Sequence, residues 1–472
     1  MSANLASNLT RTAAEHPDEI AVKLDDAAFN YGLLDHASQR VSAMLKSKGV
    51  GAGDKVGIML PNVPYFPAVY YGVLRAGAVV VPMNVLLKGR EVGFYLSDPQ
   101  VKVLFAWHGF MEAAEAGANE AGEVDVVPVK PGEIEGLIFA HEPDPEMADR
   151  AGDDTAVILY TSGTTGRPKG AELTHDNLRQ NVEVAVGLFD MGVGDVIFGG
   201  LPLFHSFGQT CTMNAAIRCG ATVTLLPRFE PGKALEILQR DACTVFEGVP
   251  TMYGALLNHP DRNSYDVSKL RVCASGGASL PVEVLRGFEE CFGCKVLEGY
   301  GLSETSPVAS FNHPDRDRKP GSIGTPIEGV EFKLVDDDGN EVAQGEIGEI
   351  LIKGHNVMKG YLNQPEATAD AIKDGWFATG DMAKVDEDGY YFIVDRKKEL
   401  IIRGGYNVYP REIEEVLYEH PAVREAAVVG VPHDDLGEEV GAAVALKDGA
   451  DVEIDELRAF VKDQVAAYKY PR

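Results

Sequence analysis

The stretch YTSGTTGRPKG, residues 160–170, decides how the rest of the chain is interpreted. It follows a short apolar run, residues 156–159, and it precedes Thr174, which stands where the N-cap of an amphipathic helix is expected. Backbone N–H groups, hydroxyl donors and positive charge in a strand–loop–helix context predict a loop that binds phosphate. The groups that supply these donors and charges are Thr161, Ser162, Thr164, Thr165, Gly163, Gly166, Gly170, Arg167 and Lys169.

A flexible surface loop rich in Ser, Thr and Gly is the alternative explanation of this composition. The position directly after an apolar run, and the clustering of donors with Lys169, favour phosphate binding. The stretch is not a Walker A loop, because that motif needs a lysine directly after its second glycine, whereas Lys169 follows Pro168. The sequence therefore indicates another class of phosphate-using protein.

The composition is that of a globular protein with a large core. The chain has 472 residues, of which 45% are hydrophobic and 24% charged; such a length predicts about three domains or subdomains. No stretch approaches the roughly 18 apolar residues of a membrane helix, and the first residues lack the apolar segment of a signal peptide. We therefore expect no transmembrane segment and a cytoplasmic location. Cys291-x-x-Cys294 has no second pair to complete a zinc site, so we expect structural thiols.

The net charge of −29 argues against nucleic acid as a partner, because a nucleic-acid binder needs a basic face. A protein this acidic must gather cations wherever it binds phosphate. Lys169 and the basic run at residues 396–403 therefore stand out, although a solvated surface patch would also explain the run. The acidic surface indicates solubility and leaves the oligomeric state open, with a homodimer as one option.

Alternating helical and apolar patterns predict an α/β fold with largely parallel sheets and flanking helices. A less regular connection, residues 112–152, leads to the phosphate loop. Helical patterns cover residues 33–49, a segment ending at Leu74, a segment from Asp176, and residues 232–240 and 281–291. Strand patterns cover residues 55–60, 78–81, 221–226, 243–249, 270–274 and 295–298.

The sequence pattern changes near residue 330 from alternating helices and strands to strands alone. Asp338-Gly339 and Asp388-Gly389 each separate two of these strand patterns. D-G turns of this kind predict hairpins, so we expect a β-rich subdomain at about residues 320–395 within an N-terminal domain of residues 1–395. A smaller α+β domain is expected at residues 396–472, with its boundary on the basic run. Its predicted elements are strands 400–402, 425–431 and 440–446 and helices 410–419 and 454–467.

Four further motifs carry groups suited to chemistry. LPLFHSFG (201–208) places His205 among aromatic residues, which suits a lid over an apolar substrate. SGGAS (275–279) and EGYGLSET (298–305) follow strands, and ligands bind at the carboxyl ends of parallel strands. In EGYGLSET, Tyr300 can stack on a base and Glu304 can hold Mg²⁺. Thr379-Gly-Asp381 offers an acid at a turn. The alternative explanation for SGGAS and EGYGLSET is an ordinary turn rich in Gly and Ser, and for Asp381 it is an ordinary turn aspartate.

Together these motifs resemble the adenylate-forming superfamily of acyl-CoA synthetases, nonribosomal peptide synthetase adenylation domains and firefly-type luciferases. YTSGTTGRPKG, LPLFHSFG, GYGLSET, WFATGD and DRKKELIIRGGYNVYPREIE carry the resemblance, and their order spans nearly the full chain. The resemblance implies a large N-terminal domain and a small mobile C-terminal domain. It also implies activation of a carboxylic acid with Mg-ATP to an acyl-adenylate and pyrophosphate, followed by transfer of the acyl group to CoA.

The resemblance implies a nucleotide site built from these motifs. Tyr300 matches the adenine-stacking position, and Ser303 matches a hydroxyl on the α-phosphate that is often Thr in the family. Glu304 matches the Mg²⁺ ligand, with Thr161 beside it. The loop around the β- and γ-phosphates is matched by Thr161, Ser162, Gly163, Thr164, Thr165, Gly166 and Lys169. The other nucleotide-binding positions implied are Asp381 and Arg396 on the ribose hydroxyls, and Gly276, Gly277, Ala278, Glu298, Gly299 and Gly301.

The remaining implied roles concern acyl binding and transfer. His205 matches a gate residue beside the acyl site, and Lys398 falls at the hinge between the domains. Gly404 and Gly405 match the loop that moves to the pantetheine tunnel for thioester formation. The expected catalytic residues are Lys169, His205, Glu304 and Lys398, and the expected cofactors and co-substrates are ATP, Mg²⁺ and CoA.

The chain departs from the family near its end. A Pro-Lys-x-x-x-Gly-Lys segment, whose lysine bridges carboxylate and phosphate during adenylation, is absent before Tyr470-Pro471-Arg472. We expect this tail to be missing from the present sequence rather than lost in nature. Its loss should slow adenylation about a hundred- to thousand-fold and spare thioester transfer from supplied acyl-adenylate, and near-normal pyrophosphate release would contradict this.

Residues 246–253 and 275–279, expected to line the acyl pocket, are mostly apolar or small, and the only acid near Phe246 is Glu247. An uncharged acyl tail is therefore favoured, with medium- or long-chain fatty acids first and aryl acids such as coumarate still open. One enzymatic alternative is a ligase that loads a carrier-protein phosphopantetheine instead of CoA. The alternative from another class is a relic that binds acyl chains or nucleotide without turnover.

Overall fold

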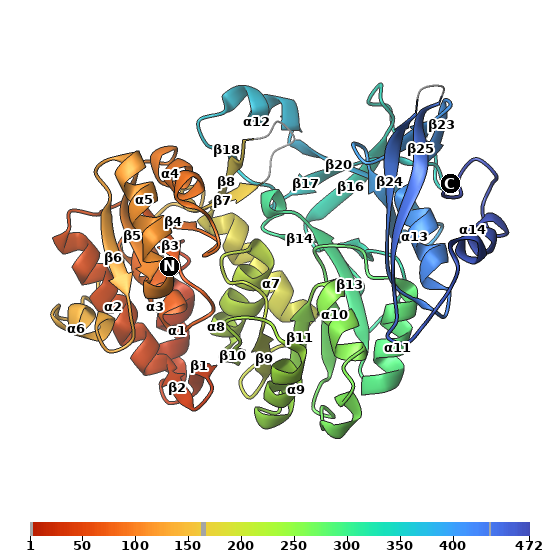
Figure 1. Cartoon of the computed structure of the whole chain (residues 1–472). Coiled ribbons are helices and arrows are strands. Elements are labelled where there is room, and N and C mark those ends of the chain that lie inside the picture. The colour runs from red at the N-terminus through yellow and green to blue at the C-terminus, as the bar shows by residue number, and fades with distance from the viewer. Residues whose placement is uncertain (1–2, 162–166, 434–435) are drawn as a thin grey trace.

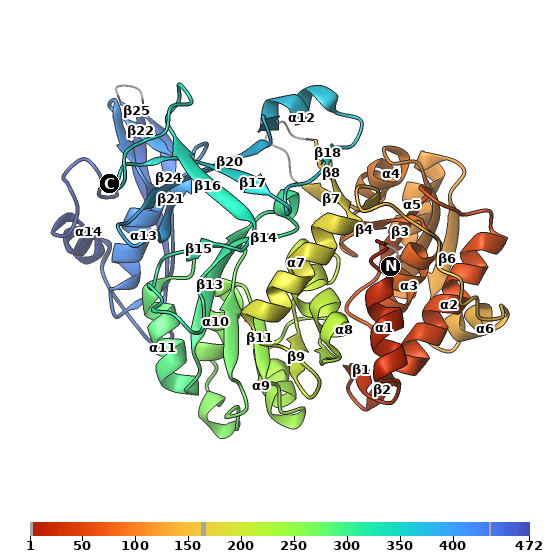
Figure 2. The same cartoon turned by 180° about the vertical axis from the view of Figure 1, so that it is seen from behind.

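The computed structural model describes residues 3–161, 167–433 and 436–472. Four β-sheets flanked by helices make up these residues, which confirms the predicted α/β fold. Figures 1 and 2 show the sheets following one another across the molecule, from the strands drawn in orange at one side to the C-terminal unit drawn in blue at the other. None of the helices in the described ranges combines the length and apolarity that crossing a membrane requires.

The first sheet has seven strands and carries the predicted phosphate loop. Its parallel part, β6-β5-β3-β4-β7, is extended by antiparallel β8 and β18. The strands are β3 (Lys55–Met59), β4 (Val79–Pro82), β5 (Val101–Trp107), β6 (Asp125–Val129), β7 (Thr155–Thr161), β8 (Lys169–Thr174) and β18 (Gly360–Tyr361). The helices of this part of the chain are α1 (Ser7–Glu15), α2 (Tyr31–Ser47), α3 (Tyr65–Arg75), α4 (Gly89–Ser97), η1 (His108–Phe110), α5 (Met111–Ala121) and α6 (Ile134–Phe139).

Residues 112–152 are more regular than the sequence suggested. We expected an irregular connection, but α5, β6 and α6 occupy much of this segment. Val127 and Val129 of β6 are buried, and Val127 pairs with Phe105 of β5. Long-range burial against β5 therefore overrides the Ala/Glu/Gly-rich local composition.

The second sheet has nine strands in the order β15-β14-β13-β12-β11-β9-β10-β1-β2. The central pairs are parallel, while β2, β14 and β15 pair antiparallel. The strands are β1 (Ile20–Leu24), β2 (Ala27–Asn30), β9 (Val196–Gly199), β10 (Thr222–Leu225), β11 (Val245–Gly248), β12 (Val272–Ser275), β13 (Val296–Gly301), β14 (Val308–Phe311) and β15 (Thr325–Pro326). The helices are α7 (His175–Leu188), η2 (Gly208–Asn214), α8 (Ala215–Cys219), α9 (Pro231–Arg240), α10 (Pro250–Leu257), η3 (Arg262–Ser264), α11 (Val282–Phe292) and η4 (Ser303–Thr305).

The predicted hairpins form the third, β-rich sheet. Gly339 and Gly389 of the two D-G turns have φ of 83° and 82°, which a side chain would disfavour. The strands are β16 (Val330–Val335), β17 (Gly348–Gly354), β19 (Ile372–Lys373), β20 (Trp376–Val385) and β21 (Tyr391–Arg396), and α12 (Pro365–Ala371) precedes β19. We expected Asp381 at a turn, but it lies inside β20, where Gly380 has a φ of 75°.

The C-terminal unit contains the fourth sheet, with strand order β23-β22-β25-β24. It has a buried cluster of its own, in which Val408, Ile413 and Val428 meet between the sheet and α13. Its elements are β22 (Ile401–Arg403), β23 (Tyr406–Val408), α13 (Pro410–Tyr418), β24 (Val423–His433), β25 (Gly437–Leu446) and α14 (Ile454–Lys462). The last helix is shorter than the predicted 454–467.

Candidate active site

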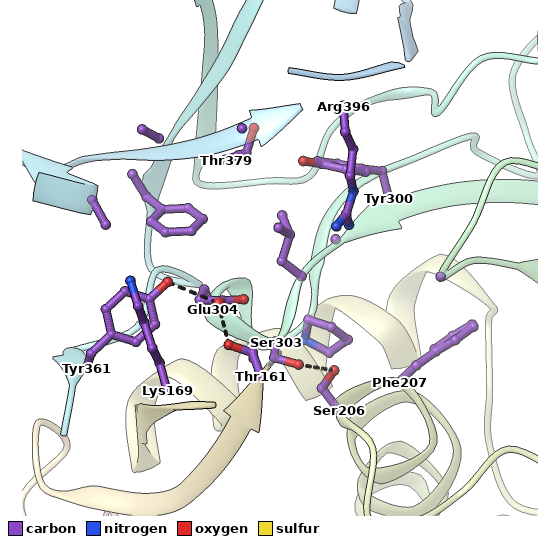
Figure 3. Close-up of a pocket in the computed structure, with 18 of the residues that line it drawn as sticks. Thr161, Lys169, Ser206, Phe207, Tyr300, Ser303, Glu304, Tyr361, Thr379 and Arg396 are labelled. Atoms are coloured by element: carbon purple, nitrogen blue, oxygen red, sulfur yellow. Dashed lines mark hydrogen bonds between the residues drawn. The ribbon is translucent and has the colours of Figure 1, made fainter. Parts of the chain in front are cut away.

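A cleft of about 1120 Å³ lies where β7, β13 and β20 meet the loop around His205. Figure 3 shows side chains from these separate elements pointing into it. The cleft exceeds the roughly 300–1,000 Å³ of most ligand pockets, so it has room for a large ligand or two smaller ones. The predicted residues in its wall are Thr161, Lys169, His205, Gly276, Gly277, Gly299, Tyr300, Gly301, Ser303, Glu304, Arg396 and Lys398.

The ends of the predicted phosphate loop lie on two paired strands. Thr161 ends β7 and pairs with Lys169, which begins β8. Thr174 caps α7 as predicted, because its hydroxyl accepts from the Asn177 backbone N–H at 3.1 Å. The expected strand–loop–helix context is wrong, however, since β8 separates the loop from the helix. The predicted phosphate contacts Ser162, Gly163, Thr164, Thr165 and Gly166 lie outside the described residues.

Glu304 is the acidic centre of the cleft. It lies in η4, and the residue is 8% exposed. Its Oε1 accepts from the Thr161 hydroxyl at 3.2 Å and from the Tyr361 hydroxyl at 3.1 Å (Figure 3). Within residues 3–161, 167–433 and 436–472, no ion pair neutralises this carboxylate. A buried anion without a cationic partner suits a bound cation.

The same residues fit Mg²⁺. The described part of the chain contains no cluster of three or more His, Cys, Asp or Glu side chains arranged for a metal. Mg²⁺ keeps water and substrate phosphates among its ligands and needs only one or two protein groups. Glu304, with the Thr161 hydroxyl beside it, meets that requirement once a polyphosphate occupies the cleft.

Tyr300 and Arg396 converge on Asp381. The Tyr300 hydroxyl donates to Asp381 Oδ2 at 2.5 Å, and Arg396 Nε lies 3.2 Å from Oδ1. Burial raises the pKa of Asp381 from its ordinary value, although Tyr300 and Arg396 oppose the rise. Because both oxygens are engaged and the residue is 4% exposed, Asp381 lies behind the cleft wall rather than in it.

Close backbone approach explains the glycines on either side of Tyr300. A Cβ on Gly299 would lie 2.0 Å from the Phe311 ring, and one on Gly301 would lie 1.8 Å from the Pro307 carbonyl oxygen. Both contacts come from β14 and the chain just before it, which pack beside β13. The GYG motif therefore lets β14 approach while Tyr300 faces the cleft.

A polar contact joins the loop of His205 to the GYGLSET segment. Ser206 Oγ lies 3.4 Å from Ser303 Oγ (Figure 3). The Phe207 ring lies 3.1 Å from where a Cβ of Gly276 would stand. The absence of a side chain at Gly276 therefore leaves room for the ring in the cleft wall. His205 lines the same end of the cleft and is exposed.

Several predicted site residues do not line the cleft. Glu298 is buried behind it, accepts from the Leu280 backbone N–H at 3.1 Å, and has its pKa raised to about 7 by burial. Gly404 and Gly405, with φ of 58° and 85°, join β22 to β23 in the C-terminal unit. The predicted site residues outside the wall are Ala278, Glu298, Asp381, Gly404 and Gly405.

Most of the residues expected to line the acyl pocket do not line this cleft. Phe246 packs in the core against Phe198, with ring centroids 5.4 Å apart, because β11 lies in the middle of the second sheet. None of residues 246–253 reaches the cleft, whereas Gly276 and Gly277 do. The apolar wall is instead formed by Phe207, Leu302, Pro307, Val308 and Phe311.

Glu247 gives a testable pH dependence of stability. It is fully buried, and burial raises its pKa to about 7 although the Thr212 hydroxyl donates to it. Between about pH 4.3 and 7 the folded protein therefore binds more protons than the unfolded chain, so stability falls as pH rises. In thermal denaturation, the Tm of Glu247→Gln relative to the wild type should rise by about 2–5 °C from pH 5 to pH 8. A Tm difference that does not change with pH would contradict this.

Tyr361 and α12 are the site residues that sequence reasoning missed. Tyr361 comes from an edge strand of two residues, and Gln364, Glu366 and Asp370 reach the cleft from in and around a short helix. Nothing in the local spacing marks them, because β18 takes its place only by pairing with β8, far away in the sequence. The Gly-Tyr pair after Lys359 was the one visible signal.

Comparison with known proteins identifies the family of this chain. The family model described as AMP-binding enzyme matches residues 9–362, and the AMP-binding enzyme C-terminal domain matches residues 412–472. The chain is 39% identical to a long-chain-fatty-acid–CoA ligase of Bacillus subtilis (strain 168), covering 99% of this chain and 90% of that protein. It is 37% identical to a feruloyl-CoA synthase of Amycolatopsis sp, covering 99% and 94%.

A solved structure shows the same architecture. The anthranilate CoA ligase AuaEII in complex with anthranoyl-AMP superposes with a TM-score of 0.95 at 29% identity, covering 99% of this chain and 92% of that one. Since the family model spans most of the chain and the relatives match it from end to end, the chain belongs to the AMP-binding enzyme family, the adenylate-forming superfamily that its motifs resemble.

Proposed function

We propose that the protein is an ATP-dependent acyl-CoA synthetase. It joins a carboxylic acid to the thiol of CoA through an acyl-adenylate, with release of pyrophosphate and AMP. The observation that carries the proposal is the convergence of Lys169, Glu304 and Tyr300 in one cleft of a chain that belongs to the AMP-binding enzymes. The proposed setting is the cytoplasm.

The first half-reaction needs charge to be controlled around the triphosphate. An oxygen of the carboxylate attacks the α-phosphorus, a P–O bond to the β-phosphate breaks, and the electron pair leaves with pyrophosphate. Lys169 stabilises the leaving pyrophosphate, and the Ser303 hydroxyl contacts the α-phosphate. Glu304 and Thr161 would hold Mg²⁺ together with the phosphates, and the ion would supply positive charge where negative charge develops.

The nucleoside is held at the other end of the cleft. Tyr300 stacks on the adenine, and Arg396 with Asp381 takes the ribose hydroxyls. Tyr300 and Arg396 each engage one oxygen of Asp381, and the remaining lone pairs of these oxygens can accept from the sugar hydroxyls. The cradle of glycines that includes Gly276 and Gly277 lets the ligand approach the backbone.

The second half-reaction transfers the acyl group. The CoA thiolate attacks the acyl carbonyl carbon, and the C–O bond to AMP breaks. We propose domains of residues 1–395 and 396–472 with a hinge near Lys398, which the separate buried cluster of the C-terminal unit supports. Movement at the hinge would bring Gly404 and Gly405 to the cleft, while His205 gates the acyl end.

The acid is proposed to be a medium- or long-chain fatty acid. Phe207, Val308 and Phe311 offer an apolar wall without fixed charge, and the Bacillus relative is named for long-chain fatty acids. An aryl acid is the second candidate, because a feruloyl-CoA synthase is 37% identical. Stacking on Phe207 would suit such an acid.

Product analysis tests the function directly. Incubated with Mg-ATP, CoA and a panel of fatty and aryl acids, the protein should release pyrophosphate and form acyl-CoA with at least one acid. We expect kcat/KM at least about 100-fold higher for the preferred class, since each buried methylene contributes about 0.8 kcal/mol. Pyrophosphate without acyl-CoA would favour a carrier-protein acceptor, and neither product from any acid would contradict the proposal.

A further inference from the structure

Tyr361 touches two groups of opposite charge in the cleft. Its hydroxyl donates to Glu304 Oε1 at 3.1 Å, and Lys169 Nζ lies 4.9 Å from the centroid of its ring. Figure 3 shows the three side chains side by side, with Thr161 completing the contact to Glu304. One neutral side chain therefore separates the acid from the cation while holding both.

The backbone fixes Tyr361 firmly enough for this task. β18 pairs with β8 so that Tyr361 lies opposite Ala171, and the Leu362 N–H donates to the Gly170 carbonyl at 2.8 Å. The Tyr361 N–H donates to the Thr368 hydroxyl at 2.9 Å. In an antiparallel pair, a residue and the one two places from its opposite share a face, which brings the Tyr361 ring over Lys169.

The hydroxyl of Tyr361 orients the Glu304 carboxylate. Oε1 accepts from both Tyr361 and Thr161, while no described residue donates a hydrogen bond to Oε2. The Tyr361 hydroxyl is the donor in its contact with Glu304, because a carboxylate oxygen can only accept. Two donors on one oxygen fix the carboxyl plane and leave the other oxygen for a cation.

The Tyr361 ring lies beside the Lys169 ammonium without forming an ion pair with it. In the part of the chain that the structure describes, no carboxylate forms an ion pair with Lys169, although Glu304, Glu366 and Asp370 line the same cleft. A carboxylate partner would compete with phosphate for the ammonium donors. The face of an aromatic ring attracts the cation more weakly and can release it to a phosphate.

We propose that Tyr361 is a positioning residue that presents Glu304 to the divalent cation and Lys169 to the phosphates of the nucleotide. The inference rests on the proposed function, since it assigns Tyr361 a part in that reaction. It predicts separable defects, because the hydroxyl serves Glu304 and the ring serves Lys169.

Two variants separate these contributions. Tyr361→Phe keeps the ring and removes the hydroxyl, and it should weaken Mn²⁺ binding about tenfold in the presence of ATP, measured by electron paramagnetic resonance. The Mg²⁺ concentration for half-maximal pyrophosphate release should rise by the same factor. Tyr361→Leu removes the ring as well and should raise the KM for ATP a further two- to fivefold. Tyr65→Phe, which removes a tyrosine–glutamate hydrogen bond to Glu135 outside the cleft, is the matched control and should match the wild type.

The results of these measurements distinguish a failure of the Tyr361 inference from a failure of the proposed function. Mn²⁺ affinity in Tyr361→Phe within twofold of the wild type would overturn the role of the hydroxyl, and identical KM values for ATP in both variants would overturn the role of the ring. A wild-type protein that releases no pyrophosphate with any acid contradicts the proposed function, while the Mn²⁺ titration still decides the metal part of the inference. If Tyr65→Phe lost as much Mn²⁺ affinity as Tyr361→Phe, the effect would not be specific to the cleft and the inference would be overturned.

Discussion

Glu304→Gln is expected to lower kcat/KM for pyrophosphate release about 100- to 1000-fold. Glutamine keeps the size of the side chain and can still accept from Thr161 and Tyr361, so the local hydrogen bonds survive. What is lost is the negative charge of a buried acid that has no cationic partner among the described residues. Initial rates at saturating acid, measured over a range of Mg²⁺ and ATP, give the size of the loss.

The matched control for Glu304→Gln is Glu236→Gln, on the exposed surface of α9, where Glu236 pairs with Lys233. It removes the same charge away from the cleft and should leave the rate unchanged. If Glu304→Gln stays within threefold of the wild type at low Mg²⁺, the cation is held elsewhere and the proposed metal position is wrong.

Asp381→Asn is expected to raise the KM for ATP about 10- to 100-fold and to leave the KM for the acid unchanged. The substitution removes the charge that Arg396 faces and weakens the acceptor of the Tyr300 hydroxyl. Tyr300 and Arg396 both lie in the cleft wall, so nucleotide binding should be weakened more than acid binding. Kinetics with ATP and acid varied independently separate the two ends.

A nucleotide lacking ribose hydroxyls sharpens the Asp381 test. With 2′,3′-dideoxy-ATP the penalty of Asp381→Asn should largely vanish, because the missing hydroxyls cannot be bound in either protein. Asp336→Asn is the control, since Asp336 is a turn aspartate that accepts backbone N–H groups from Asp338 and Asn340 in the same β-rich sheet. An undiminished penalty with dideoxy-ATP would mean that Asp381 supports the fold and not the ribose.

Local chemistry made part of the fold predictable. Thr174 caps its helix because a threonine hydroxyl before an amphipathic pattern satisfies a free N–H, and the two D-G turns form hairpins because Gly339 and Gly389 accept positive φ. Long-range pairing was not visible in the same way. β6 is a strand because β5 buries it, and β8 intervenes before α7 because it pairs with β7.

The same distinction between local signals and long-range pairing applies to the site residues. Tyr300 and Glu304 stand at or just after the end of β13, and Thr161 ends β7, so each is recognisable as a ligand-binding position at a strand end. Their proximity is not predictable in this way, because β7 and β13 belong to different sheets. Tyr361 joins them only through an edge strand of two residues, which no periodic pattern announces. Phe246 and Glu247 of β11 were expected beside the ligand but are buried in the core, and an apolar strand has the same sequence pattern in either setting.

The pairing of β18 with β8 bears on the order in which the protein is made. β8 ends at residue 174, yet the strand that covers its outer edge begins at residue 360. At 5–20 residues per second, ribosomes need on the order of 10 to 40 s to synthesise the intervening chain. During that interval the edge of β8, beside the loop that is proposed to grip the nucleotide, lacks its native neighbour. Chaperone protection should therefore matter most in this window of translation, because an uncovered strand edge invites pairing with other chains.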